Sequence, residues 1–253
     1  MAVSQGLASV PLESCSASEV LEWAIYSFGN SFAISTSFQN EGMVIIDMAA
    51  RISPGVRAFT LDTGRLPDET YQMVEAVRER YGICVEMVSP DAAEIESMTA
   101  QHGPNLFYRE PALRMLCCQI RKVRPLERKL KELKAWAVGL RRGQNEERAE
   151  IPKIDTGGGM VKISPLAHWH KQQVEDYIHQ HAVPVHPLYA KGYTSIGCAP
   201  CTRPVQLGEE ERTGRWWWEQ DASKECGIHF TPSGKAERKL DVLLSEVLAA
   251  KHV

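Results

Sequence analysis

Residues 32–61 read FAISTSFQNEGMVIIDMAARISPGVRAFTL and contain three candidate elements in a row. The largely apolar run Phe32–Ser37 predicts a strand, which passes into a polar turn at Phe38–Gly42. Apolar residues at helical spacing predict a helix over Met43–Ile52, and Val56–Leu61 predicts a second strand. A strand, a helix and a strand in this order indicate a right-handed crossover between parallel strands.

The same alternation continues on both sides of this segment. Ser18 is a candidate N-cap for a helix that ends at Phe28. Pro67 and Gly82 mark the start and the end of another helix. The remaining expected elements are a strand at Ile83–Val88, a basic helix at Leu113–Leu133, strands at Ala135–Leu140 and Met160–Ile163, and a helix at His168–His181. The sequence therefore predicts an α/β fold in which helices flank a parallel sheet.

Composition divides the chain into three segments. We expect an N-terminal helical segment at 1–30, the α/β domain at 31–205, and a tail at 206–253 that covers the site. From Gly192 onward the regular pattern gives way to Gly, Pro, Cys, Arg and Trp. The tail ends in an amphipathic helix, which the apolar spacing predicts over Ser233–Ala250.

The overall charge excludes some classes of partner. The 253 residues include 29 basic and 32 acidic side chains, a net charge of −3, so nucleic acid is not an expected partner and any anion must bind locally. No run approaches the roughly 20 apolar residues of a membrane-spanning helix, and Met1–Ser9 lacks a signal-peptide pattern. We expect a cytoplasmic protein without a membrane partner, and a homo-oligomer is compatible with this composition.

Four of the seven cysteines form two close pairs. Cys117 and Cys118 are adjacent, and two residues separate Cys198 from Cys201. Four thiolates suit either a zinc ion or an iron–sulfur cluster. Adjacent cysteines reach one zinc ion only in a strained geometry, whereas a cluster spreads its ligands over separate irons. The spacing favours a cluster and leaves zinc as the alternative.

Cys226 stands apart from these pairs and is a candidate nucleophile. It lies in the segment Lys-Glu-Cys-Gly-Ile-His, in which Lys224 and His229 can stabilise a thiolate. An ordinary exposed cysteine near the end of the chain is the alternative. Cys84 lacks such neighbours and is expected in the core of a strand.

Two arginines precede a run of three tryptophans. Arg212 and Arg215 are three residues apart, so their guanidinium groups can hold one phosphate or sulfate group from one side. Three exposed tryptophans would be costly, and we expect Trp216–Trp218 to be buried as the wall of a pocket.

Two polar turns follow the first two predicted strands. The first is Ser35–Gly42, and the second is Leu61–Arg65. The carboxyl ends of parallel strands are the edge at which open α/β sheets bind ligands, and a helix N-terminus favours an anion. Neither turn has a dinucleotide-binding or phosphate-loop glycine pattern, which argues against a Rossmann dehydrogenase and a P-loop hydrolase.

Five motifs, in this order and between Ser31 and His229, resemble the assimilatory adenylyl-sulfate reductases of the phosphoadenylyl-sulfate reductase family. They are Leu-Asp-Thr-Gly-Arg, the Cys-Cys pair, Cys-Ala-Pro-Cys, Glu-Arg-x-Gly-Arg-Trp-Trp-Trp and Lys-Glu-Cys-Gly-Ile-His. The resemblance implies an adenine-nucleotide hydrolase-like (HUP-type) fold, a 4Fe-4S cluster and a nucleophilic cysteine that becomes an S-sulfonate. The first turn departs from the family, because it reads Ser-Phe-Gln-Asn-Glu-Gly where Ser-Phe-Ser-Gly-Ala-Glu-Asp is commoner.

The resemblance also implies roles for individual residues. The cluster ligands would be Cys117, Cys118, Cys198 and Cys201, and Cys226 would attack sulfur. The phosphosulfate would be bound by Lys122, Arg212, Arg215 and His229. The nucleotide pocket would be lined by Ser35, Ser37, Leu61, Asp62, Thr63, Gly64, Arg65, Arg141 and Arg142.

The implied reaction is the reduction of adenylyl sulfate to sulfite and AMP, in assimilatory sulfate reduction and cysteine biosynthesis. Thioredoxin or a glutaredoxin-like protein would be the partner that supplies electrons. Acceptance of 3'-phosphoadenylyl sulfate as well is one alternative. A non-catalytic iron–sulfur or zinc sensor that binds a nucleotide is another, although it leaves the Cys226 motif unexplained. An ATP pyrophosphatase would carry Ser-Gly-Gly-x-Asp-Ser after the first strand, and this chain does not.

Overall fold

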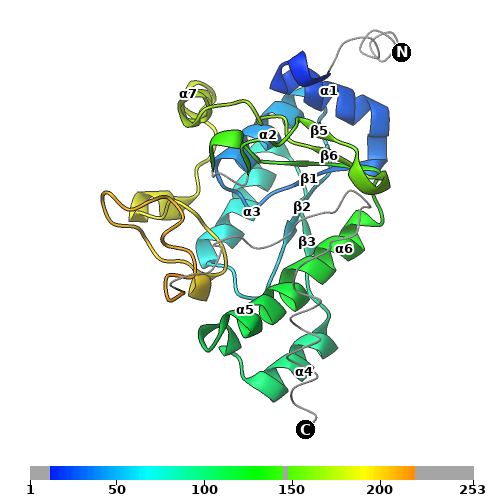
Figure 1. The fold of residues 1–253 in the computed structure, drawn as a ribbon. Helices are drawn as coiled ribbons and strands as arrows, with labels where there is room; N and C mark the ends of the chain where they lie inside the picture. The colour runs from blue at the N-terminus through cyan, green and yellow to red at the C-terminus, as the bar shows by residue number, and fades with distance from the viewer. Residues whose placement is uncertain (1–11, 145–147, 220–253) are drawn as a thin grey trace.

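The computed structural model describes residues 12–144 and 148–219, which form a six-stranded sheet with helices on both faces (Figure 1). The strand order is β3-β2-β1-β4-β6-β5, and every neighbouring pair is parallel except β5 with β6. The strands are β1 (Phe32–Ser35), β2 (Ala58–Leu61), β3 (Glu86–Val88), β4 (Ala135–Val138), β5 (Ile154–Asp155) and β6 (Val161–Ile163). The α-helices are α1 (Ala17–Phe28), α2 (Asn40–Ile52), α3 (Asp68–Tyr81), α4 (Ala92–His102), α5 (Pro111–Cys118), α6 (Arg124–Leu130) and α7 (Lys171–His181). The predicted α/β fold with a parallel sheet is confirmed, with one antiparallel strand at its edge.

Alternating side chains of the strands build a separate core on each face of the sheet. Phe32 and Ile34 of β1 point to the face covered by α1, α2, α3 and α7. Ala33, between them, points to the opposite face, where α6 packs. Both faces of β1 are buried, so its residues are apolar without a polar alternation. The carboxyl end of β1 is therefore held rigidly from both sides.

Several helix boundaries differ from the sequence prediction, and α7 for example begins at Lys171 rather than His168. Ser16, and not Ser18, caps α1: its hydroxyl accepts from the backbone N–H of Glu19 at 3.3 Å. The Glu19 carboxylate accepts in turn from the Ser16 N–H at 2.7 Å, which completes a capping box. Helix α2 begins at Asn40, earlier than expected, because part of the polar turn after β1 closes into the first helical turn.

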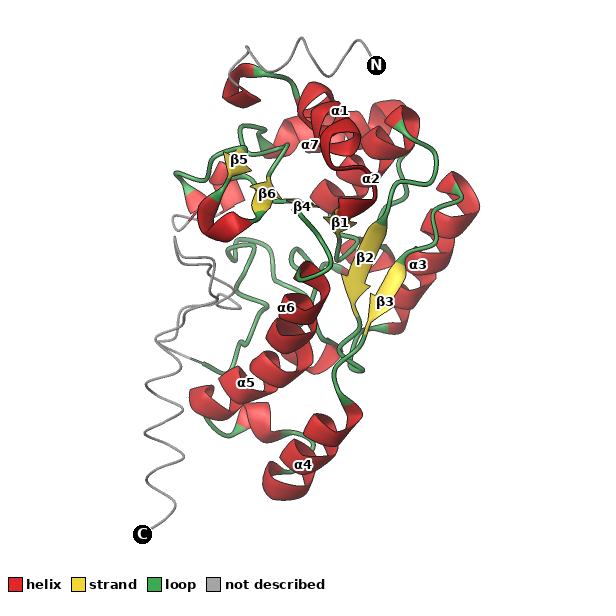
Figure 2. Cartoon of the chain, turned by 90° about the vertical axis from the view of Figure 1, so that its right-hand side faces the viewer, coloured by secondary structure: helices red, strands yellow, loops and turns green. Residues whose placement is uncertain are grey.

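The basic helix predicted over Leu113–Leu133 is divided into α5, a π-helical turn at Gln119–Val123, and α6. Pro125 lies at the start of α6 and has no N–H with which to continue an α-helical hydrogen-bond pattern. Figure 2 shows α5 and α6 running end to end, and α4 contacts the π-helical turn that joins them.

Two elements were not predicted from the sequence, and one cysteine was misplaced. Helix α4 has only one buried residue, Met98, so its apolar pattern is weak, and β5 is only two residues long. Cys84 is exposed, contrary to the prediction that it lies in strand core, because β3 begins only at Glu86. Within 12–144 and 148–219, no helix has both the length and the apolar character needed to cross a membrane.

Asp47 joins three helices at the centre of one face. Its side chain is 1% exposed and accepts hydrogen bonds from Arg51 Nε at 2.8 Å, Tyr81 OH at 3.1 Å and Tyr177 OH at 2.8 Å. Burial alone would raise the pKa of Asp47, but these donors outweigh it and the pKa is lowered. Burial, together with the nearby carboxylate, raises the pKa of Tyr81 to about 12.

We expect Asp47→Asn to destabilise the fold by about 1–3 kcal/mol, because a hydrogen-bonded buried charge is lost. Since the pKa of Asp47 is lower in the folded protein, its contribution is present at neutral pH and is lost as the pH falls through that pKa. Denaturant unfolding at several pH values checks this: the wild type should lose more stability in acid than the variant. Glu75→Gln is the control, because Glu75 is exposed and forms only a 4.0 Å surface pair with Arg78. Equal stability of the wild type and Asp47→Asn at pH 7 would contradict the assignment.

Candidate functional site

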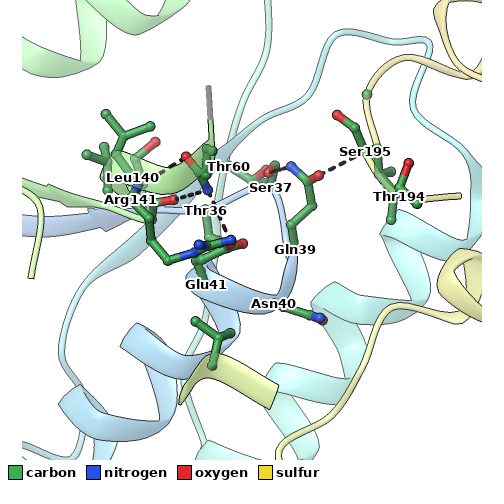
Figure 3. Close-up of a pocket in the computed structure, with 18 of the residues that line it drawn as sticks. Thr36, Ser37, Gln39, Asn40, Glu41, Thr60, Leu140, Arg141, Thr194 and Ser195 are labelled. Atoms are coloured by element: carbon green, nitrogen blue, oxygen red, sulfur yellow. Dashed lines mark hydrogen bonds and ion pairs between the residues drawn. The ribbon is translucent and has the colours of Figure 1, made fainter. Parts of the chain in front are cut away.

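A large cavity opens at the carboxyl edge of the sheet, where the strand order reverses between β1 and β4. In the sheet, β2 and β3 lie on the β1 side of this point, whereas β6 and β5 lie on the β4 side. Open α/β sheets bind ligands at this kind of reversal point. The cavity has a volume of about 690 Å³ and is lined by residues at the ends of β1, β2 and β4 and by parts of 185–215 (Figure 3). We refer to it as the strand-edge cavity.

The turn after β1 forms one wall of this cavity. Ser35 and Ser37 both line it. The Gln39 side chain donates to the Ser37 hydroxyl at 2.9 Å and accepts from the backbone N–H of Ile196 at 2.9 Å. Figure 3 shows Gln39 between Ser37 and the 194–195 segment. The side chain of Gln39 therefore ties the β1 turn to the segment that precedes the second cysteine pair.

The turn after β2 is divided between two sites. Leu61 and Thr63 line the strand-edge cavity, but Asp62, Gly64 and Arg65 are not among its lining residues. The Asp62 carboxylate instead accepts from Tyr71 OH and from the Gly64 N–H, both at 2.9 Å. Asp62 therefore shapes the turn.

Arg65 points away from the strand-edge cavity and lines a second, smaller one beside it. Its guanidinium group donates to the carbonyl of Pro104 at 2.6 Å and to Asn105 Oδ1 at 2.8 Å, and it lies 5.1 Å from the ring centroid of Phe107.

The two arginines after β4 also point in different directions. Arg141 lines the strand-edge cavity and donates to Glu41. Arg142 does not line it; its side chain donates to the carbonyl of Ile151 at 2.9 Å and to Glu13 Oε1 at 3.2 Å. Arg142 therefore anchors the loop that carries Arg141.

All four paired cysteines line the second, smaller cavity. Cys117 and Cys118 lie at the end of α5, whereas Cys198 precedes and Cys201 ends the short helical turn Ala199–Cys201. Each is 7–8% exposed. The hydroxyl of Thr63 lies 3.2 Å from Cys198 Sγ. We refer to this space as the cysteine cavity.

The thiols of the cysteine cavity influence one another. Burial and the nearby Cys198 raise the pKa of Cys201 to about 12, and burial also raises the pKa of Cys117. Among the residues that the structure describes, no three cysteine, histidine or acidic side chains are arranged to hold a single metal ion. Four thiols around one cavity are a donor set that can hold an iron–sulfur cluster, because a cluster distributes its ligands over several irons.

Lys122 lines both cavities. It lies in the π-helical turn, four residues after Cys118, so a helical turn brings it back toward the cysteines. Its neighbour Arg121 is buried beside the same cysteines and donates to the carbonyl of Thr63 at 2.6 Å. The boundary between the two cavities is therefore positively charged.

Arg212 and Arg215 also line the strand-edge cavity. Arg215 is 5% exposed, and its guanidinium carbon lies 4.7 Å from the ring centroid of Trp216. Its Nη1 atom is 3.4 Å from the hydroxyl of Ser195, and its Nε has no hydrogen-bond partner in the described part of the chain. A buried guanidinium group that is not fully satisfied is suited to bind an anion.

The three tryptophans do not form one wall, contrary to the prediction. Trp216 is 1% exposed and lines the cysteine cavity, whereas Trp217 is 40% exposed. Consecutive side chains project in different directions, so a run of three cannot face one pocket. Arg114 also lies over Trp216, at 4.5 Å from the ring centroid, and pairs with Glu219 at 2.6 Å.

Cys226 and His229 lie outside the described residues. Several polar residues of the strand-edge cavity were not singled out individually from the sequence, among them Gln39, Glu41 and Ser195, although the first two lie in the predicted polar turn Ser35–Gly42. Their polar side chains next to a strand end or a cysteine pair are the only signal that could have indicated them.

Comparison with known proteins shows the family to which the chain belongs. Residues 31–204 match the phosphoadenosine phosphosulfate reductase domain family. An adenosine 5'-phosphosulfate reductase of Allochromatium vinosum is 44% identical over 202 residues, 79% of each chain. The crystal structure of a phosphoadenylyl-sulfate reductase from Candida auris, in complex with phosphate, is 31% identical with a TM-score of 0.64, covering 78% of this chain and 94% of that one.

A yeast FAD synthetase shares the fold at 14% identity and a TM-score of 0.50, covering 74% of this chain and 66% of the synthetase. The HUP-type nucleotide-binding fold that the sequence predicts is confirmed. With most of the α/β domain matched and relatives above 40% identity, the chain belongs to the phosphoadenosine phosphosulfate reductase domain family and resembles its adenosine 5'-phosphosulfate reductases.

Proposed function

We propose that this protein reduces adenylyl sulfate to sulfite and AMP through an S-sulfonate on Cys226, in assimilatory sulfate reduction and cysteine biosynthesis. The observation that carries the proposal is the position of Lys122, which lines both the strand-edge cavity and the cysteine cavity. A nucleotide at the strand edge can then present its anionic end to Lys122 and Arg215, beside the four thiols. The names of the 44% identical relatives support adenylyl sulfate as the substrate.

The proposed chemistry depends on the cations at the boundary between the cavities. A thiolate and a sulfate repel each other, and Lys122, Arg212 and Arg215 reduce that repulsion. The Cys226 thiolate attacks the sulfate sulfur, so a sulfur–sulfur bond forms while the bond from sulfur to the phosphate oxygen breaks. AMP leaves with the electron pair of that bond. The same cations stabilise the charge that develops on the departing phosphate.

A dithiol protein of the thioredoxin or glutaredoxin class completes the proposed reaction. Its first thiolate attacks the sulfur of Cys226 and expels sulfite, which leaves a mixed disulfide. Its second thiol then reduces that disulfide, so the dithiol supplies both electrons and ends as a disulfide. Cys226 must become accessible to this partner after the first step, which requires the part of the tail that carries Cys226 to leave the site. A dithiol reductant suits a reducing compartment such as the cytoplasm.

Cys117, Cys118, Cys198 and Cys201 are the proposed ligands of a 4Fe-4S cluster. Arg65, Arg114, Arg121 and Lys122 line the same cavity, and they would balance the negative charge of four thiolates. When bound, the cluster would contribute charge and order beside the anionic end of the substrate.

The chain is accordingly divided into a helical segment at 1–30, a nucleotide-binding and cluster-binding domain at 31–205, and a catalytic tail at 206–253.

The first prediction concerns the cluster. Purification without oxygen should yield iron together with acid-labile sulfide, and Cys201→Ser should lose both, because a hydroxyl is a poor ligand for the irons. Cys84→Ser is the matched control, since Cys84 is exposed and lines neither cavity, and it should retain both. Stoichiometric zinc without sulfide in the wild type would show that the four cysteines hold a zinc ion.

The second prediction concerns the nucleophile. Wild-type protein mixed with adenylyl sulfate, without a thiol reductant, should gain the mass of one SO3 group on the peptide that contains Cys226. Thioredoxin should then remove the adduct and release sulfite. Cys226→Ser should bind AMP but form no adduct, because serine is a far weaker nucleophile at neutral pH. Cys84→Ser should still form it. An adduct on another cysteine, or turnover by Cys226→Ser, would contradict the mechanism, and a wild type that never releases sulfite would favour a sensor.

The third prediction concerns Arg215. A Cβ atom at Gly197 would lie 2.6 Å from the Arg215 guanidinium carbon, so Gly197→Ala must displace this side chain. We expect AMP to bind about tenfold more weakly or worse, because a charge-assisted contact contributes about 1.5–3 kcal/mol. Arg215→Ala should weaken binding similarly, and calorimetry measures both. Gly143→Ala is the control, since its nearest neighbour would be 3.9 Å away. Unchanged AMP affinity in Arg215→Ala would remove Arg215 from the site.

A further inference from the structure

Several cations line the strand-edge cavity, and one of them is paired with a buried carboxylate. Lys122 and Arg215 lie near the cysteines, and Arg212 lines the cavity as well. Arg148, Lys162 and Lys171 are further lining cations, and Lys171 pairs with Glu211. Arg141, beside the strand ends, is paired with Glu41, so the charge of this arginine is neutralised.

The pair between Glu41 and Arg141 is close and buried. The Glu41 carboxylate accepts from Arg141 Nη2 at 2.7 Å and from Arg141 Nε at 2.8 Å through the same oxygen. Gln144 Nε2 donates to that oxygen at 3.1 Å. The side chains of Glu41 and Arg141 are 13% and 6% exposed. Figure 3 shows the two side chains next to each other in the wall of the cavity.

The Arg141 guanidinium would otherwise suit a phosphate group, because its planar shape suits two hydrogen bonds to phosphate oxygens. Two of its nitrogen atoms instead donate to one oxygen of Glu41, so they are not available to a ligand without breaking the pair. Glu41 lies in the first turn of α2, where the helix dipole favours its negative charge.

Tight backbone packing keeps Glu41 in this place. A Cβ atom at Gly139, which follows β4, would lie 2.9 Å from the Cβ of Glu41 and 2.9 Å from the N atom of Gly42. The end of β4 is therefore in direct contact with the first turn of α2. The backbone of Glu41 therefore cannot move away from the cavity floor without separating these two elements.

We propose that Glu41 determines specificity by excluding nucleotides that carry a second phosphate on the ribose, an inference that rests on the proposed function. A second phosphate carries a charge of about −1.5 to −2 at neutral pH and is repelled by the Glu41 carboxylate. If it bound Arg141, it would leave Glu41 buried without its partner, which is costly. Glu41 thus discriminates by repelling the nucleotide with the second phosphate, and not by making better contacts to the nucleotide without it.

The test compares the dissociation constants of AMP and adenosine 3',5'-bisphosphate for the full-length protein by calorimetry. The wild type should bind AMP at least about tenfold more tightly than the bisphosphate. Glu41→Gln keeps the shape of the side chain and a hydrogen-bond acceptor for Arg141, but it removes the charge. In this variant the ratio of the two constants should shift toward the bisphosphate by about tenfold or more.

Two further variants make the result specific to this pair. Glu175→Gln removes one negative charge from the same cavity but from α7, and the ratio should stay within about threefold of the wild type. In the double variant Glu41→Gln, Arg141→Gln, the ratio should return toward the wild-type value. The single variant frees the Arg141 guanidinium to bind the second phosphate, and the double variant lacks that guanidinium.

The possible outcomes separate this inference from the proposed function. If the wild type binds neither nucleotide, the proposed function is refuted and the inference with it. If the wild type binds AMP but does not prefer it to the bisphosphate, only the role of Glu41 is overturned. The same holds if Glu41→Gln binds AMP and the ratio of the two dissociation constants is unchanged. A shift of the same size in Glu175→Gln, or one that persists in the double variant, would overturn it as well.

Discussion

The pairing of β1 with β4 is the contact on which both cavities depend. Phe32 through Ser35 pair in register with Ala135 through Val138, so the two strands end side by side. The turns that follow them are brought together although Glu41 and Arg141 are 100 residues apart in the chain. This close approach requires a residue without a side chain at Gly139. A shift of the register would separate the turns and remove the cavity floor.

The positive charge near the cysteines is held largely by aromatic rings and carbonyl groups. Arg215 is stacked on Trp216, and Arg121 donates to a backbone carbonyl. Carboxylates in these places would cancel the charge that an anionic ligand needs and would repel the thiolates. A cation–π contact holds a guanidinium group without adding negative charge. Arg114 is the exception: it pairs with Glu219 and does not line the strand-edge cavity, so its charge is not required there.

The sequence predicts the layers of the fold and the edge of the sheet at which the cavity lies, because apolar periodicity and turn residues are local signals. The predicted strands were too long, since residues such as Ser37 continue the sequence pattern of a strand after its pairing with the neighbouring strands has ended. The grouping of the four cysteines could be inferred from the resemblance.

Side-chain direction could not be predicted. Arg65 and Arg142 are adjacent in sequence to residues that line the strand-edge cavity, yet they point elsewhere, because a neighbour in sequence need not share a face. The pair between Glu41 and Arg141 depends on a long-range register that no local pattern encodes.

The π-helical turn between α5 and α6 allows the two halves of this long helix to evolve separately. A continuous α-helix has 3.6 residues per turn, so one added or removed residue rotates everything beyond it by roughly 100°. A π-helical turn accommodates one additional residue locally. Helix α5 can therefore keep Cys117 and Cys118 directed to their cavity while α6 keeps Leu126 and Leu130 on the sheet. A relative that has lost the cysteines would be free to lose the added residue and return to a continuous α-helix.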